Sequence, residues 1–204
     1  AAAMLNEQNE GMIRQIKGAA ADPDPVAFIS FGQNVALLDE RLASVWLTEL
    51  DVLPDPKSPW SGNRMGKKGV PALVVSLIEA FPTSRRVALG GCMSLYVLAS
   101  SDEDLAVSNR RRQYVVDQGG LRALAGVLRA FALGPPKVGF AACKALYQVC
   151  GGEMQGSPRG NEARAIAARE GLVELVASYL EKHSFCSNTT PHVCPDDWAS
   201  YAEG

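Results

Sequence analysis

The sequence predicts an all-α protein made of repeated helical units, and three observations support this prediction. Gly69, Gly120 and Gly171 lie 51 residues apart, and each begins a similar apolar stretch. Eight positions of residues 69–99 recur without a gap in residues 120–150. Within these stretches, apolar residues recur with the i, i+3, i+4 and i+7 spacing of an amphipathic helix. A fixed period of this length is typical of repeat proteins, in which each unit buries its apolar face against the next.

The composition indicates a folded chain with a buried core. Of the 204 residues, 47% are hydrophobic, and the mean hydropathy of -0.01 argues against wholesale disorder. The net charge is -2 and the pI is about 5.8. A general binder of polyanions usually carries a basic excess, so this balance argues against nucleic acid as the partner.

Three features of the sequence concern the cellular compartment. No run approaches the ~18 apolar residues of a membrane-spanning helix, and the first residues lack the basic and apolar regions of a secretory signal. The five cysteines are an odd number, so reduced thiols are the simplest interpretation. We therefore expect an intracellular, reducing compartment, with the cytoplasm favoured and an organelle left open.

Residues 1–50 are expected to form a helical N-terminal cap, which is a degenerate version of the repeat. A helical pattern covers 4–19, two prolines interrupt it, and a short apolar turn or helix follows at 26–31. Asn34 is a suitable N-cap for the amphipathic helix predicted over 35–50.

Residues 51–68 are predicted to be a loop, because prolines and glycines interrupt any sustained period and Trp60 serves only as an anchor. The repeats occupy 69–183, and an irregular C-terminal tail follows at 184–204. The helices predicted within the repeats are 70–81, 85–99, 110–116, 120–132, 137–150, 161–169 and 171–182.

The order of these elements, a short helix, a glycine and two longer helices, resembles the armadillo repeat. The resemblance is carried by residues 115–124 and 166–175, which are similar to the family's short first helix, glycine bend and start of the second helix. It covers about 63–183. It implies a right-handed α-solenoid of about three repeats, with the extra residues of the long period placed in loops near 100–109 and 151–160.

The resemblance also implies where a partner would bind. The family generally binds proteins on a concave face lined by its third helices. Where its peptide-binding members carry an asparagine, this chain has Val97 and Gln148, and the accompanying tryptophan position holds Met93 and Lys144. This departure argues against recognition of nuclear-localisation signals. It favours a folded partner or a helix, contacted by these four residues.

One cluster in the tail has the residue types of a metal site. Its members are His183, Cys186, His192 and Cys194. Zinc accepts histidine and cysteine in tetrahedral geometry, so zinc binding or a thiol-dependent activity is an alternative function. The spacing is not one of the standard patterns, and a flexible or partner-docked tail is the competing interpretation. Cys92 and Cys143 fall on the predicted buried stripe, where cysteine serves as a small hydrophobic residue.

Two further segments are candidates for surface contacts. Arg110, Arg111 and Arg112 could form a basic edge against phosphate or an acidic protein surface, and a solvated helix start is the competing interpretation. In the tail, Trp198 and Tyr201 lie among acidic residues and could form a short docking segment.

The sequence therefore predicts a non-catalytic scaffold or adaptor that binds protein. No set of residues converges on a catalytic pattern, and no cofactor is expected. Because so short an array exposes its ends, we expect the chain to be a subunit of a larger hetero-complex.

Overall fold

Helices are the regular elements of the described part of the chain, which confirms the predicted all-α class. The computed structural model describes residues 2–22, 24–34, 36–52, 62–100, 104–132, 134, 136–151 and 158–184. The helices are α1 (Ala2–Ala20), α2 (Pro25–Asn34), a 3-10 turn (Ala36–Leu38), α3 (Glu40–Val52), α4 (Gly62–Lys67), α5 (Val70–Ala80), α6 (Arg85–Leu98), α7 (Leu105–Asp117), α8 (Gly120–Ala130), α9 (Pro136–Val149), α10 (Pro158–Arg169) and α11 (Leu172–Ser184).

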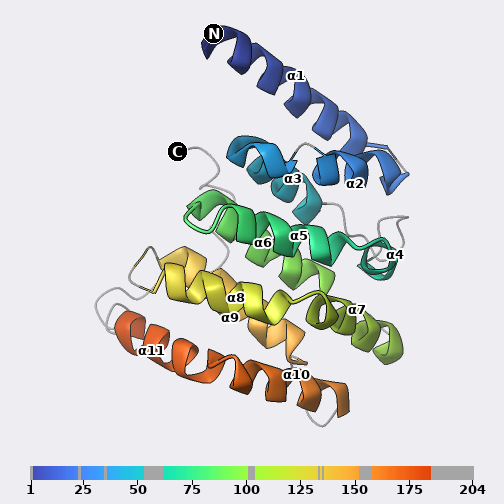
Figure 1. Ribbon diagram of the computed structural model, residues 1–204. Helices are drawn as coiled ribbons and strands as arrows, with labels where there is room; N and C mark the ends of the chain where they lie inside the picture. Colours follow the sequence, from blue (N-terminus) through green and yellow to red (C-terminus); the bar gives the residue numbers. More distant parts are fainter. Residues whose placement is uncertain are drawn as a thin grey trace.

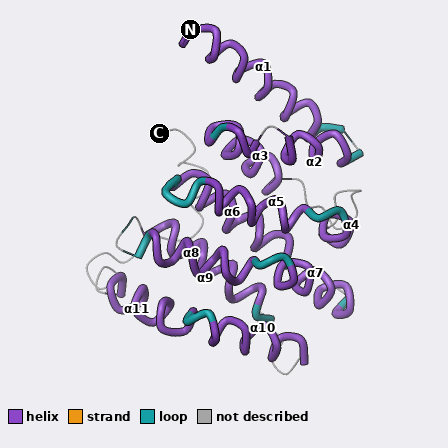
Figure 2. Tube along the Cα trace, in the orientation of Figure 1, coloured by secondary structure: helices purple, strands orange, loops and turns teal. Residues whose placement is uncertain are grey.

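The helices pack in three rows (Figures 1 and 2). The first row contains α3, α6 and α9, the second contains α2, α5, α8 and α11, and the third contains α4, α7 and α10. At one end of the stack α1 packs on α2 and α3, and α10 and α11 form the other end (Figure 1). Apolar side chains of successive helices meet in one continuous core.

The bend in the second repeat is made by Gly119, and not by Gly120 as the 51-residue spacing predicts. Gly69, Gly119 and Gly171 have φ angles of +78°, +82° and +70°, a left-handed conformation that favours glycine. In each case the glycine carbonyl accepts a hydrogen bond from the amide four residues later, in the first turn of α5, α8 or α11. Gly120 is required for another reason, because a Cβ there would lie 2.8 Å from the carbonyl oxygen of Val115.

This shift is explained by one extra residue in a turn. The buried positions of α5 recur in α8 after 50 residues, whereas most of those of α6 recur in α9 after 51. Phe81 and Phe131, which follow α5 and α8, are also 50 residues apart. The extra residue therefore lies between α8 and α9, where five residues (131–135) replace the four (81–84) between α5 and α6.

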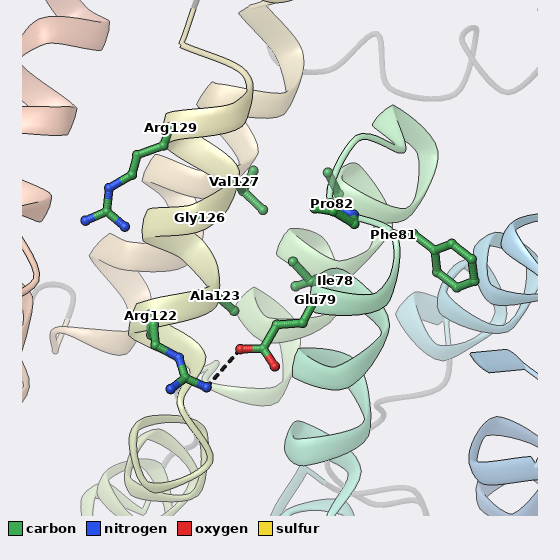
Figure 3. A pocket seen from close by; sticks show the side chains of 10 residues that line it. Ile78, Glu79, Phe81, Pro82, Arg122, Ala123, Gly126, Val127 and Arg129 are labelled. Carbon is green, nitrogen blue, oxygen red and sulfur yellow. Dashed lines mark hydrogen bonds and ion pairs between the residues drawn. The ribbon is translucent and has the colours of Figure 1, made fainter. Parts of the chain in front are cut away.

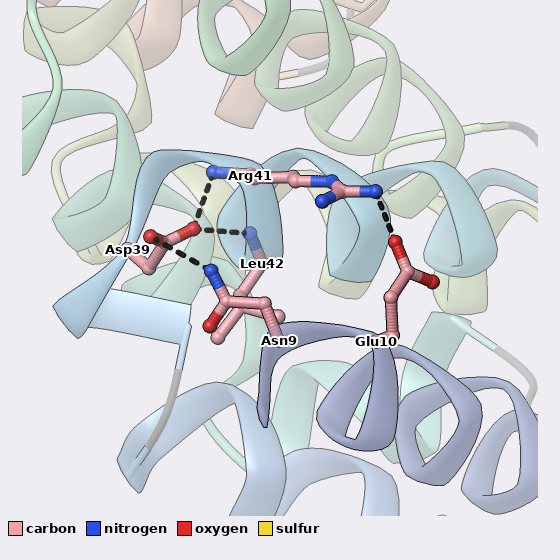
Figure 4. A network of polar contacts seen from close by, with 5 residues as sticks. All are labelled: Asn9, Glu10, Asp39, Arg41 and Leu42. Carbon is pink, nitrogen blue, oxygen red and sulfur yellow. Dashed lines mark hydrogen bonds and ion pairs between the residues drawn. The ribbon is translucent and has the colours of Figure 1, made fainter. Parts of the chain in front are cut away.

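The N-terminal unit repeats the same capping geometry. Asp39 Oδ1 accepts hydrogen bonds from the amides of Arg41 and Leu42, at 2.8 and 3.1 Å, at the start of α3 (Figure 4). At the start of α6, Ser84 Oγ accepts from the amide of Val87 at 3.2 Å. These two caps are 45 residues apart, and α3 and α6 lie side by side in the same row.

The predicted helix over 35–50 begins later than expected, and its cap is a different residue. A 3-10 turn precedes α3, which begins at Glu40 with Asp39 as its cap. Asn34 is the last residue of α2, and its side chain donates to the Ser30 carbonyl at 2.8 Å. The cause is local: the carboxylate of Asp39 can satisfy two amides of α3, so the chain changes direction there.

Two contacts hold α1 on α3. Asn9 Nδ2 donates to Asp39 Oδ2 at 3.5 Å, and Glu10 forms an ion pair with Arg41 (Figure 4). Deeper in this unit, Trp46 is fully buried. Its indole stacks on Phe28 with ring centroids 4.9 Å apart and donates to the Phe28 carbonyl at 2.8 Å.

The predicted loop over 51–68 contains a helix, so this prediction is wrong in part. Residues Gly62–Lys67 form α4. Met65 is fully buried, and Gly66 approaches α7 so closely that a Cβ would lie 2.2 Å from the ring of Tyr114. A six-residue helix is too short to show a period in the sequence, and tertiary packing stabilises it. Trp60 lies outside the described residues.

The helix predicted over 110–116 is longer than expected. It begins at Leu105, because Asp104 Oδ1 accepts hydrogen bonds from the amides of Ala106 and Val107 at 2.8 and 3.4 Å. Residues 105–109, which were assigned to a loop, are therefore the first turn of α7. Acidic residues in front of a helix are good caps, and this signal was present in the sequence.

Candidate partner-binding surface

The partner-contact residues predicted from the family resemblance lie on two neighbouring helices. Met93 and Val97 belong to α6, Lys144 and Gln148 belong to α9, and all four are partly buried. Because α6 and α9 pack side by side, these residues share one region, which we call the α6–α9 surface. Its members are Met93, Tyr96, Val97, Phe140, Lys144, Tyr147 and Gln148.

The most exposed members of the α6–α9 surface are two aromatic side chains. Phe140 is 48% exposed and Tyr147 is 55% exposed. They are seven residues apart on α9, so both lie on one face of the helix. The sequence predicted that Tyr96 and Tyr147 would both pack against the core. Tyr96 is partly buried and packs against it, whereas Tyr147 does not. The sequence did not single out Phe140.

The charges on this surface are of one sign. Lys144 Nζ lies 4.4 Å from the centroid of the Tyr96 ring, as expected for a cation–π contact. Neither α6 nor α9 contains aspartate or glutamate, and their basic residues are Arg85, Arg86, Lys137 and Lys144. The two helices therefore present aromatic and aliphatic side chains together with positive charge.

Gln148 has a structural contact as well as a place on this surface. Its side-chain Nε2 donates to the carbonyl oxygen of Ala99, at the end of α6, at 3.4 Å. Its own backbone carbonyl accepts from Nε of Arg112 at 3.1 Å. Gln148 thus connects α6, α7 and α9, so its role includes holding the row together.

The three arginines do not form the predicted basic edge. Arg110 is exposed, but Arg111 and Arg112 are only 6% and 5% exposed. Arg111 Nη1 donates to the carbonyl of Ser100 at 3.4 Å, and Arg112 Nε donates to the carbonyl of Gln148. Burial lowers the pKa of Arg112 below its ordinary value. The solvated helix start is wrong for these two residues as well.

The buried guanidinium groups have a clear structural role. They contact carbonyl oxygens at the C-terminal ends of α6 and α9, which have no partner within their own helices. A cation is also favourable there, because the helix dipole places partial negative charge at this end. The arginine run is therefore a capping device of the first row, and it leaves only Arg110 for a basic surface.

A pocket that the sequence did not predict lies between α5 and α8 (Figure 3). Its volume is about 330 Å³. Ile78, Ala123 and Val127 are among its apolar lining residues, and an ion pair of 2.9 Å between Arg122 and Glu79 lies at its edge. Its lining also includes Gly126, at which an added Cβ would meet no atom within 4 Å. A glycine inside a helix was the only sequence signal for it.

The cysteines of the described residues do not have the properties of nucleophiles. Cys92 is fully buried, as predicted, whereas Cys143 is only partly buried. Cys143 and Cys150 both have pKa values raised by burial, and for Cys150 the nearby Arg164 opposes this shift. A reactive thiol needs a lowered pKa, so the geometry does not favour thiol chemistry at these positions.

Of the predicted metal ligands, only His183 lies in the described part of the chain. Its ring lies 4.4 Å from the ring of Tyr179 (centroid to centroid), and its Nε2 is buried and makes no hydrogen bond. Within the described residues, no three histidine, cysteine or acidic side chains are grouped to hold a metal ion. The remaining predicted tail residues, Cys186, His192, Cys194, Trp198 and Tyr201, lie outside the described residues.

The comparisons with known proteins give no relative. This chain matches no protein-family model, no curated protein and no solved structure. In the portion of the chain that the structure describes, no helix has both the length and the apolar character needed to cross a membrane. The functional argument therefore depends on the geometry of the chain itself.

Proposed function

We propose that this chain is a non-catalytic docking protein built as an armadillo-like, right-handed α-solenoid of about three units. The three rows would be the first, second and third helices of successive units, with α3, α6 and α9 as the third helices. Supporting this are the bend glycines 69, 119 and 171 and the matched burial of α5 with α8 and of α6 with α9.

The observation that carries the proposal is the exposure of Phe140 and Tyr147 on a helix that has no acidic residue. Large aromatic side chains exposed together on one face are typical of protein interfaces. The bound partner would offer apolar side chains flanked by carboxylates, since Lys144 and the other basic residues of α6 and α9 favour negative charge. Binding to such a surface needs no catalytic group and no cofactor.

Affinity capture from cell extract, with quantitative identification of the recovered proteins, tests this proposal. The test variant is Phe140→Ser/Tyr147→Ser. The matched control is Val26→Ser/Leu38→Ser, which removes two side chains that are 53% and 80% exposed at the other end of the molecule. Each aromatic anchor of an interface contributes about 2 kcal/mol or more, so the test variant should lose its partner by at least about thirtyfold in affinity.

The outcome has a clear opposite. Proteins that bind the wild type and the control but not the test variant would support docking at the α6–α9 surface. If wild type and test variant recover the same proteins in the same amounts, docking takes place elsewhere. Circular dichroism of all three proteins shows whether each is folded, because serine at exposed positions should leave the helical signal unchanged.

A further inference from the structure

The end of the stack formed by α9 and α11 has an exposed apolar face. The α6 residues Leu89, Cys92, Tyr96 and Ala99 correspond, 51 residues later, to Phe140, Cys143, Tyr147 and Cys150 of α9. In each pair the α9 residue is the more exposed one. The reason is visible for two pairs, since Lys144 of α9 lies over the Tyr96 ring and Gln148 donates to the Ala99 carbonyl.

The second row shows the same difference at this end. Leu121 and Leu128 of α8 are 1% and 2% exposed, whereas Val173 and Leu180, 52 residues later on α11, are 61% and 55% exposed. The interval of 52 is the one that separates the bend glycines of these two helices. We call the exposed residues the terminal face: Phe140, Cys143, Tyr147, Val173 and Leu180. Within the described residues, no further helix packs on it.

The chain continues from a point beside this face. The hydroxyl of Tyr179 on α11 donates to the carbonyl of Pro136 at the start of α9, and the Tyr179 ring packs on Gly139. His183 stacks on the same ring. The C-terminal end of α11 therefore lies against the N-terminal end of α9, next to Phe140. The 14 residues of α9 span about 21 Å, and about seven extended residues cover that length.

The charges of the following segment complement those of α9. Residues 185–204 contain Asp196, Asp197 and Glu203 and no lysine or arginine. They also contain the aromatic residues Phe185, Trp198 and Tyr201. By contrast, α9 has two lysines and no acidic residue.

We propose that residues 185–204 bind the terminal face of their own chain. Their aromatic side chains cover Phe140 and Tyr147, and their carboxylates lie near Lys137 and Lys144. This contact fills the place that the third helix of a further unit would take. It needs no partner, and a partner that uses Phe140 and Tyr147 has to displace the segment first.

The alkylation rate of Cys143 in the full-length chain tests this proposal without any partner present. Wild type is compared with Trp198→Ser/Tyr201→Ser at one pH, and the modified cysteines are identified by peptide mass spectrometry. Ser187→Ala/Ser200→Ala is the matched control within the same segment. Cys92, which is fully buried, reports whether the core stays folded.

We expect Cys143 to react about tenfold faster in Trp198→Ser/Tyr201→Ser than in wild type or control, which corresponds to about 1.4 kcal/mol of contact. Cys92 should stay protected in all three. Equal rates for Cys143 would overturn the proposal. A protection that grows with protein concentration would also overturn it, because the segment would then come from a second copy.

Carbodiimide cross-linking gives an independent measurement. Cross-links from Lys137 or Lys144 to Asp196, Asp197 or Glu203 within the monomer would support the proposal. The substitution Asp196→Asn/Asp197→Asn should then reduce them. Cross-links from these carboxylates only to lysines far from α9 would count against it. If the segment is bound here but affinity capture finds no partner, only the proposed docking function is refuted.

Discussion

Gly139 provides a sharp test of how α9 and α11 pack. It lies inside α9, where glycine is less favourable than alanine by about 1 kcal/mol. An added Cβ would lie 2.1, 2.6 and 2.8 Å from three ring atoms of Tyr179. Carbon atoms in contact are about 3.5 Å apart or more, so in Gly139→Ala the ring must retreat by at least about 1.4 Å.

The cost follows from what this movement breaks. Overpacking of a close contact costs about 1–3 kcal/mol, and loss of the Tyr179 hydrogen bond to Pro136 costs about 1 kcal/mol. The gain in helix propensity offsets about 1 kcal/mol of this. We therefore expect Gly139→Ala to lower the free energy of unfolding by about 1–3 kcal/mol.

Urea unfolding followed by circular dichroism measures this difference, with Gly126→Ala as the matched control. Gly126 also lies inside a helix, but a Cβ there meets nothing within 4 Å, so this variant should be more stable by about 0.5–1 kcal/mol. In a Tyr179→Ala background the clash is absent, and Gly139→Ala should also be stabilising. If Gly139→Ala stabilises the wild-type chain as much as Gly126→Ala does, the packing of α11 on α9 described above is wrong.

Three further substitutions or titrations have expected results. Gly119→Ala should lower the urea midpoint, because the left-handed conformation costs a residue with a Cβ about 1–2 kcal/mol; an unchanged midpoint would show that another residue makes the bend. Trp46→Phe leaves the buried Phe28 carbonyl without its donor and should cost about 1–3 kcal/mol in the same assay, and a smaller loss would mean that water replaces the indole. Because burial raises the pKa of Cys143 and Cys150 above the ordinary 9.0, their alkylation rates should rise only at higher pH than that of a free cysteine. The stability that these protonated thiols contribute is correspondingly complete below the ordinary pKa and is lost as the pH rises through the raised native pKa, so titration of either thiol below pH 9 would contradict this reasoning.

The sequence by itself determined the helical class and most of the helices. Apolar residues at helical spacing fixed α5, α6, α8 and α9 to within two residues at each end, because such a stripe can be buried only in that conformation. It also indicated that glycines make the bends. It did not identify Gly119, since an interval that fits α6 and α9 conceals the one-residue difference in α5 and α8.

The tertiary structure alone decided which side chains are available on the surface. Arg111 and Arg112 look solvated in the sequence, yet they are buried because carbonyl groups at the ends of α6 and α9 accept hydrogen bonds from them. Tyr147 occupies the same repeat position as Tyr96, yet it is far more exposed because α9 covers only α6. Periodicity determines which face of a helix is apolar, but only the presence of a neighbouring helix determines whether that face is buried.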